Sequence, residues 1–232
     1  MLTLSIADIV FGIEHRYPRL CEMASDYVTD AEPQYRFSLT DAMISRERRQ
    51  AKIRRDDGYF ESLAAYRMIT KVLPRNDAML LHAAVIEIDR RAIAFTAPSG
   101  VGKSTHIDLW RRLYGDRVSI VNGDKPIVRF SPSGLPIAYG TPWAGKEGWQ
   151  RNVGLPLSDL VILRRAPFDG IRQISPSMAL SDMLSAVYFG ESEDEISKTM
   201  DLLDRLLSSV RLHLLDCTPT ENAARVAYTH LI

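Results

Sequence analysis

The sequence predicts an α/β fold with a mixed sheet and a small N-terminal α+β region. Apolar segments with strand character are interspersed with segments of helical spacing along most of the chain. A glycine-rich segment, 97–104, follows an apolar strand pattern directly and precedes a helical one. Two predicted strands, 80–88 and 92–96, are separated by only three residues, which indicates an antiparallel hairpin and therefore a sheet that is not purely parallel.

Composition limits the function classes. The 232 residues suffice for one large domain or one domain with a smaller appendage, and 46% hydrophobic with 25% charged residues is typical of globular proteins. Twenty-nine Lys and Arg balance 29 Asp and Glu, so no global field attracts nucleic acid or an anionic membrane. Cys21 and Cys217 form no disulfide framework or zinc motif, and no secretory signal or membrane span is evident. We therefore expect a cytoplasmic protein.

The N-terminal region is predicted to extend over residues 1–76. Strands are predicted within 2–11 and at 35–39, and helical patterns begin at Asp41 and cover 59–72. The basic run 46–55, which includes Lys52, fits a solvated helix face, and a clamp for an acidic peptide or phosphate is the alternative. Pro74 and Asn76 end this region, and the catalytic domain is predicted at 77–232.

The second region continues with alternating elements. Further strands are predicted at 118–121, 127–130, 135–139, 160–164 and 212–215. Helices are predicted at 104–113, 178–188, 196–208 and 222–231. Ser192 and Glu195 predict a capping box at the start of the third of these helices.

The strongest chemical signal is the segment Ala97-Pro-Ser-Gly-Val-Gly-Lys-Ser104. Glycines let successive backbone N–H groups surround phosphate oxygens, and the following helix adds its partial positive charge. The expected nucleotide-binding residues are Ser99, Gly100, Val101, Gly102, Lys103, Ser104 and Thr105. Lys103 would reach the outer phosphates and Ser104 would contact Mg²⁺. Ala97 replaces the first glycine of the full motif, and its backbone would be strained if that position needs a positive φ. The alternative interpretation of the whole segment 97–104 is an ordinary glycine-rich turn between a strand and a helix.

Four further residues are candidates for the site. Asp124 follows a predicted strand, where it could hold Mg²⁺ or accept a proton, although Asn-Gly-Asp is also a favourable turn. His82 lies on the predicted strand before the loop, a place where a satisfied core histidine is the alternative. Lys146 and Arg151 lie in or after the turn-rich segment 140–146 and are candidates for substrate contact, with a plain surface loop as the alternative.

Several ordered motifs together resemble the HPr serine kinase family. They are Leu81-His82-Ala83-Ala84, the 97–106 segment, Gly123-Asp124-Lys125-Pro126 and Gly140-Thr-Pro-Trp143. More narrowly, the chain resembles the short HPr-kinase-like proteins of peptide natural-product pathways, including lasso-peptide clusters. The resemblance covers residues 79 to the C-terminus and little of residues 1–76.

The resemblance implies a P-loop kinase core like that of phosphoenolpyruvate carboxykinase, with a mixed sheet, that transfers a phosphoryl group to a serine hydroxyl. It implies catalytic roles for Lys103, His82 and Asp124, with Asp124 in the place of the second acid of an Asp-Asp pair, usually the base toward serine. The first acid of that pair is Gly123 here. The glycine-rich segment and basic docking loop of the bifunctional HPr enzymes are missing, which disfavours HPr as the substrate. The family assembles as hexamers, so we also expect self-association.

The sequence thus predicts a Mg²⁺-dependent serine kinase that uses ATP or another nucleoside triphosphate and acts on a peptide or protein, with Ser104 and Asp124 as metal ligands. The alternatives are a kinase for a small hydroxylated metabolite and a nucleotide-binding scaffold without transfer activity. Nucleic-acid binding through the basic run ranks last. No membrane partner is expected.

Overall fold

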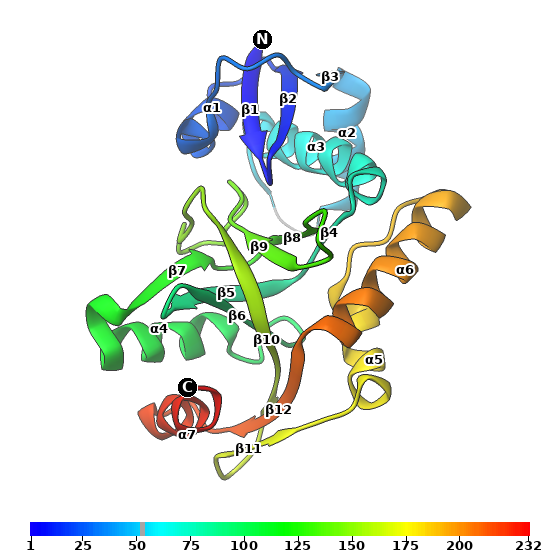
Figure 1. The fold of residues 1–232 in the computed structure, drawn as a ribbon. Coiled ribbons are helices and arrows are strands. Elements are labelled where there is room, and N and C mark those ends of the chain that lie inside the picture. The colour runs from blue at the N-terminus through cyan, green and yellow to red at the C-terminus, as the bar shows by residue number, and fades with distance from the viewer. Residues whose placement is uncertain (52–53) are drawn as a thin grey trace.

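The computed structural model describes residues 1–51 and 54–232, so Lys52 of the basic run lies outside the described residues. The chain folds as a mixed α/β protein with a central sheet and a smaller N-terminal sheet (Figure 1). The strands are β1 (Leu2–Ile6), β2 (Ile9–Glu14), β3 (Tyr35–Ser38), β4 (Ala78–Leu80), β5 (Ala83–Ile88), β6 (Arg91–Thr96), β7 (Val118–Asn122), β8 (Ile127–Phe130), β9 (Pro136–Tyr139), β10 (Gly154–Arg165), β11 (Gly170–Gln173) and β12 (Arg211–Cys217). The helices are α1 (Arg19–Met23), α2 (Asp41–Gln50), α3 (Asp57–Val72), α4 (Lys103–Tyr114), α5 (Pro176–Ala186), α6 (Glu193–Ser209) and α7 (Glu221–Leu231), with 3₁₀ turns η1 (Ser25–Tyr27), η2 (Leu73–Asn76) and η3 (Gly115–Arg117).

The central sheet is mixed, as the sequence predicts. Its strand order is β4-β8-β9-β10-β6-β5-β7, with β12 paired to β10 and β11 paired to β12. β10 runs parallel to β6 and β12 and antiparallel to β9. The predicted hairpin is β5–β6, and its loop is only Asp89 and Arg90, because Ile88 already pairs with Arg91. Both loop residues have a positive φ, as in the type I′ turn that suits the twist of a hairpin.

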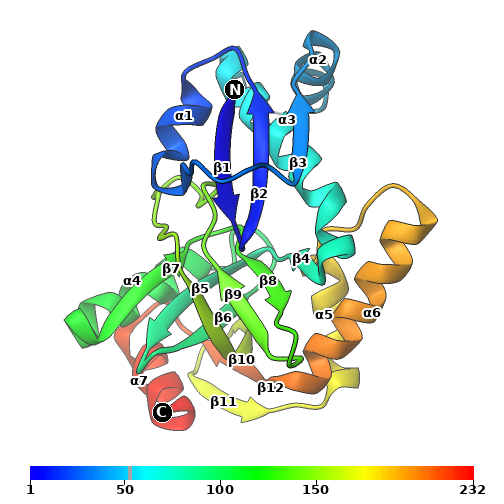
Figure 2. The ribbon, with the colours of Figure 1, turned by 45° about the horizontal axis from the view of Figure 1, so that its top comes forward.

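Helices cover both faces of the central sheet (Figures 1 and 2). Along β10, Leu160 and Ile162 belong to the core cluster formed with α5 and α6, whereas Val161 and Leu163 belong to the cluster formed with α4 and α7. Successive side chains of a strand point to opposite faces, so a strand covered on both sides is apolar throughout. β6, which leads into α4, pairs with β5 on one side and β10 on the other, so it lies inside the sheet.

The N-terminal sheet is not an independent body. β1 and β2 pair antiparallel and β3 adds parallel to β2. Its core cluster contains Phe11 and Ile69 but also Ile127 and Trp143 from the second region. The predicted apolar run 2–11 is divided by a turn at Ala7 and Asp8, both of which have a positive φ. The two regions therefore share this core cluster.

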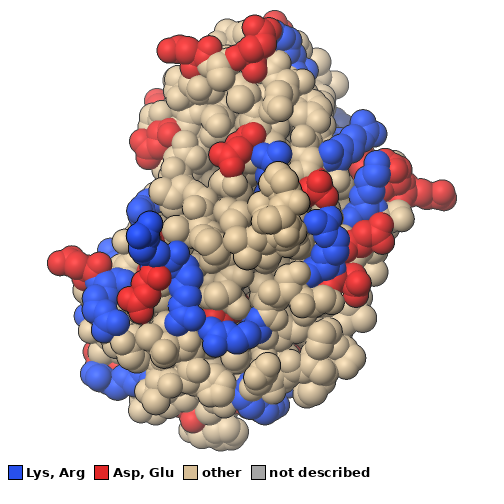
Figure 3. Space-filling model, in the orientation of Figure 1, with Lys and Arg blue, Asp and Glu red and all other residues tan. Residues whose placement is uncertain are grey.

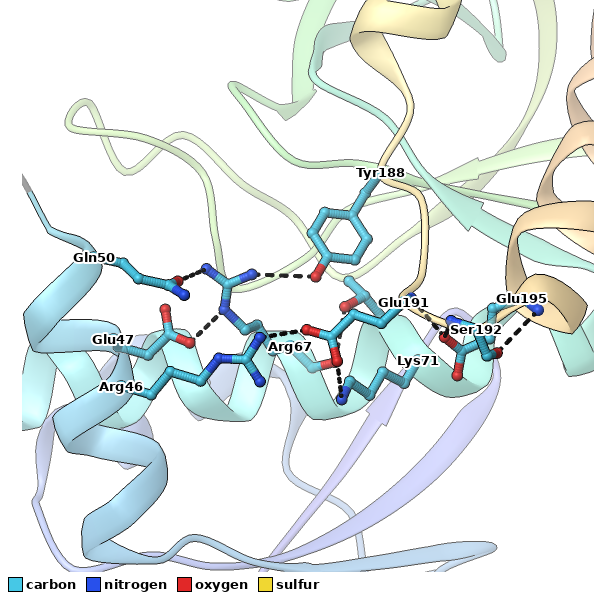
Figure 4. Close-up of polar contacts among 10 residues, drawn as sticks. Arg46, Glu47, Gln50, Arg67, Lys71, Tyr188, Glu191, Ser192 and Glu195 are labelled. Atoms are coloured by element: carbon cyan, nitrogen blue, oxygen red, sulfur yellow. Dashed lines mark hydrogen bonds and ion pairs between the residues drawn. The ribbon is translucent and has the colours of Figure 1, made fainter.

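Ion pairs also join the two regions (Figure 4). Arg67 of α3 pairs with Glu47 of α2 inside the N-terminal region, and it also donates a hydrogen bond across to the hydroxyl of Tyr188 at 3.2 Å. Glu191, in the segment between α5 and α6, pairs with Arg46 and, at 3.1 Å, with Lys71. Glu47 is only 4% exposed, so its pair with Arg67 is screened less than a surface pair.

The basic run 46–55 was predicted to lie on a helix face, but the helix does not extend to the end of the run. α2 ends at Gln50, so Arg54 and Arg55 lie outside the helix. Within α2, Arg46 and Arg48 are ion-paired, the latter with Asp57. Acidic and basic side chains are interspersed on the face of the molecule that Figure 3 shows.

Other boundaries also differ from the sequence prediction. β10 begins at Gly154, six residues before the predicted strand, while α1 and β11 were not predicted because both are too short to show a periodic pattern. The predicted strand 80–88 is interrupted at His82, which lies in a bend between β4 and β5. The capping box of Ser192 and Glu195 is confirmed. Within 1–51 and 54–232, the helices are too short or too polar to cross a bilayer.

Candidate functional site

Residues 97–102 form a tight loop, here called the glycine loop, between β6 and α4. Gly100 and Gly102 have φ angles of +82° and +126°, which residues with a Cβ rarely adopt. A Cβ built on either glycine would have no atom within 4 Å, so there is free space beside the loop. α4 begins at Lys103, and the free N–H groups of its first turn make its N-terminus suited to an anion.

Ala97 fits its place without strain. It is buried and is not among the described residues with a positive φ, so the missing first glycine costs nothing in backbone geometry. Its carbonyl accepts a hydrogen bond from Lys103 Nζ at 2.8 Å, which holds the ammonium group against the glycine loop. Burial lowers the pKa of Lys103, and the nearby Asp124 carboxylate partly opposes this.

Arg165, at the end of β10, supports the glycine loop from outside. Its Nε donates to the carbonyl of Val101 at 3.1 Å, and its Nη2 donates to the carbonyl of Gly100. The sequence does not indicate this residue, because nothing local connects position 165 to position 100. The one available signal was the position of Arg165 as a cationic residue at the end of β10, which runs parallel to β6.

Asp124 lies in a turn that Asn122 stabilises. The Asn122 side-chain oxygen accepts hydrogen bonds from the backbone N–H groups of Asp124, at 2.9 Å, and Lys125, at 2.7 Å. The Asp124 carboxylate is therefore not needed for the turn and faces a cavity instead. His82 Nε2 lies 3.3 Å and Lys125 Nζ 3.4 Å from its Oδ1 atom.

The pKa of Asp124 is lowered. Burial alone would raise it, but the hydrogen bond from His82 and the charge of Lys125 outweigh that effect. The group is therefore an ionised carboxylate at neutral pH.

The close approach of a neighbouring backbone segment explains why position 123 is a glycine. A Cβ there would come within 2.9 Å of the backbone carbonyl oxygen of Ala144, and the Gly123 N–H donates to the carbonyl of Trp149 at 2.9 Å. The segment 144–149 thus passes too close for a side chain at this position. An acidic residue next to Asp124 does not fit this backbone.

One cavity of about 420 Å³ brings most of the candidate residues together. It is lined by His82, Ser99, Gly100, Gly102, Lys103, Ser104, Thr105, Gly123, Asp124, Gly145, Lys146 and Glu147. We call it the loop cavity. Gly145 and Glu147 were not predicted from the sequence; their nearness to Lys146 was the available signal.

Two candidate residues do not line the loop cavity. Val101 lines an adjoining cavity of about 310 Å³, which it shares with Thr105, Leu109 and Cys217. Arg151 forms an ion pair with Glu87 of β5 at 2.6 Å and lines neither cavity.

A third cavity, of about 560 Å³, lies between the N-terminal region and the loop cavity, and we call it the α3 cleft. The α3 cleft and the loop cavity share Asp124, Gly145 and Lys146. Trp143 lines the α3 cleft, and its Nε1 donates to the carbonyl of Ser62 on α3 at 3.1 Å. The predicted ordered loop 140–146 is therefore held by the N-terminal region, a contact that the sequence does not indicate.

Comparison with models of known protein families and with curated proteins gave no match. Among solved structures, the chain is similar to the HPr(Ser) kinase/phosphatase from Coxiella burnetii, with a TM-score of 0.37 and 12% sequence identity. The similarity covers 65% of this chain and 95% of that chain. Similarity at this level assigns no activity and no residue role to this protein.

Proposed function

We propose that this protein is an ATP- and Mg²⁺-dependent serine kinase that phosphorylates a peptide or protein hydroxyl, such as that of a ribosomally made precursor peptide. The observation that carries the proposal is the loop cavity. It combines a glycine loop at a helix N-terminus, a buried lysine, a serine hydroxyl and an ionised carboxylate within one space.

Phosphoryl transfer depends mainly on positioning and on charge neutralisation. The amides of the glycine loop and the Lys103 ammonium supply fixed positive charge where the phosphates of a nucleotide would lie. The adjoining cavity continues from the same loop through Gly102 and Thr105 to Leu109. Its size and apolar wall suit a nucleobase.

The oxygen donors of the loop cavity fit Mg²⁺. Among the described residues, no three His, Cys, Asp or Glu side chains gather at metal-binding spacing. Mg²⁺ typically takes only one or two protein oxygens and completes its shell with phosphate and water, so Ser104 and Asp124 suffice. When bound, the ion supplies neutralising charge to the outer phosphates.

Asp124 is the group that would accept the proton of the attacking hydroxyl. It is ionised at neutral pH, and its contact with His82 fixes the orientation of the carboxylate. The serine hydroxyl would approach through the α3 cleft, because Asp124 lines both cavities.

The test is incubation of the full-length protein with ATP, Mg²⁺ and serine-containing peptides, followed by mass spectrometry. The proposal predicts a gain of one phosphate, located on a serine by fragmentation, and no gain when Mg²⁺ is chelated. Confirmed nucleotide binding without a mass gain on any peptide would overturn it. Addition of a phosphate to a hydroxylated metabolite would then favour a metabolite kinase. If no acceptor gains a phosphate, the result would favour a nucleotide-binding scaffold.

A further inference from the structure

The α3 cleft has a lining that suits a particular acceptor. It is formed by α1, the start of α3, the loop 142–146 and the turn that carries Asp124. About half of its wall therefore comes from the N-terminal region, which lies outside the motifs of the glycine loop. A ligand in this cleft is next to the Asp124 carboxylate without occupying the loop cavity.

One side of the α3 cleft is apolar and aromatic. Met23, Tyr59, Leu63, Tyr66 and Trp143 line it. The rings of Tyr66 and Trp143 lie 5.4 Å apart, centroid to centroid, in a tilted pair. Met23, Leu63 and Tyr66 are only half-buried, so apolar surface remains available beside Asp124. Such a surface gains free energy by covering an apolar or aromatic side chain of a ligand.

The entrance of the α3 cleft carries excess positive charge. The guanidinium groups of Arg19 and Arg55 lie 5.4 and 5.9 Å from the ring centre of Tyr59. Neither guanidinium has a carboxylate partner in the described part of the chain. The neighbouring carboxylate, Asp56, is already engaged, because it accepts a hydrogen bond from the backbone N–H of Tyr59 at 2.7 Å as the cap of α3. Guanidinium groups without a carboxylate partner are suited to binding a carboxylate of a ligand.

We infer that the α3 cleft is the acceptor site and that it selects a serine-bearing peptide segment with an apolar or aromatic side chain near the serine and at least one acidic residue. This inference rests on the proposed function and adds the substrate class. A volume of about 560 Å³ falls within the usual range of ligand pockets and accommodates a few residues of an extended peptide rather than a folded surface.

The test measures binding and does not need phosphoryl transfer. The full-length protein is immobilised without nucleotide and exposed to a peptide library with one fixed central serine and randomised flanks. Retained peptides are sequenced by mass spectrometry. We expect enrichment of Asp and Glu together with Leu, Phe or Tyr. In the variant R19E/R55E, enrichment of acidic residues falls about tenfold while enrichment of apolar residues remains.

The matched control is R36E/R49E, which reverses two exposed arginines of the same region that do not line the α3 cleft. It should select the same peptides as the wild type. Because all four arginines are exposed, both variants should fold, and R19Q/R55Q gives a milder version of the same change. A wild type that retains no acidic peptides, or an acidic preference that survives R19E/R55E, overturns the inference. Acidic peptides that bind but are never phosphorylated would instead contradict the proposed function and leave the cleft assignment standing.

Discussion

Asp124 and His106 show how the surroundings of a residue set its charge. Asp124 is partly buried but stays ionised because His82 and Lys125 contact it. His106 of α4 is almost fully buried, and its Nε2 accepts a hydrogen bond from Trp110 Nε1 at 3.0 Å. Burial lowers the pKa of His106 to about 4, an effect that the distant Asp169 only partly offsets.

The pKa of His106 predicts a loss of stability in acid. Between pH 6.5 and about 4, the unfolded chain binds a proton at this residue and the folded chain does not. The free energy of unfolding should therefore fall across this window by up to about 3 kcal/mol on account of this group. Urea denaturation of the wild type and of H106Q at several pH values measures it. H106Q should show a shallower dependence on pH, and equal slopes in the two proteins would refute the assignment.

At the scale of elements, the loop 140–146 depends on α3. Trp143 is 8% exposed, packs in the N-terminal core cluster and donates to the carbonyl of Ser62. The Trp143 side chain therefore forms part of the wall of the α3 cleft and also anchors the start of the segment 144–149, which passes close to Gly123.

Replacing Trp143 by Phe should therefore destabilise the protein. The variant W143F keeps an aromatic ring but loses the hydrogen bond and part of the packing, which costs about 1–2 kcal/mol. Equilibrium unfolding in urea measures the change. W149F is the control, because the Trp149 ring is less buried and lies against Arg111 at 4.9 Å. Equal losses for the two variants would show that Trp143 has no special anchoring role.

The elements also show what the sequence could and could not predict. The glycine loop was predictable because strand, loop and helix are consecutive in the chain, so their spacing carries the signal. The turn at Asp124 was predictable as a turn, but which residue stabilises it was not, since that depends on the Asn122 side chain. The α3 cleft was not predictable, because it joins Arg19 and Tyr59 to Trp143 across long sequence separations.

At the scale of the whole molecule, the candidate site lies where the two regions meet. The central sheet supplies the glycine loop and Asp124, and the N-terminal region supplies about half of the α3 cleft. The shared core cluster and the ion pairs of Glu191 with Arg46 and with Lys71 hold the regions together, and Figure 4 shows these pairs. The N-terminal region is therefore part of the site in this account, and a chain lacking it would lose both acceptor binding and the anchored loop.

The most direct test of the central claim compares Asp124→Asn with the wild type in two assays on the same preparation. We expect the rate of phosphate transfer to a serine peptide to fall about 10²–10⁴-fold, because the proposed proton acceptor, which is also a proposed Mg²⁺ ligand, is lost. Nucleotide affinity, measured by titration without Mg²⁺, should stay within a few-fold, because the glycine loop and Lys103 are intact. Transfer that persists at the wild-type rate, or a loss of affinity equal to the loss of transfer, would contradict the role of Asp124 and with it the proposed kinase mechanism.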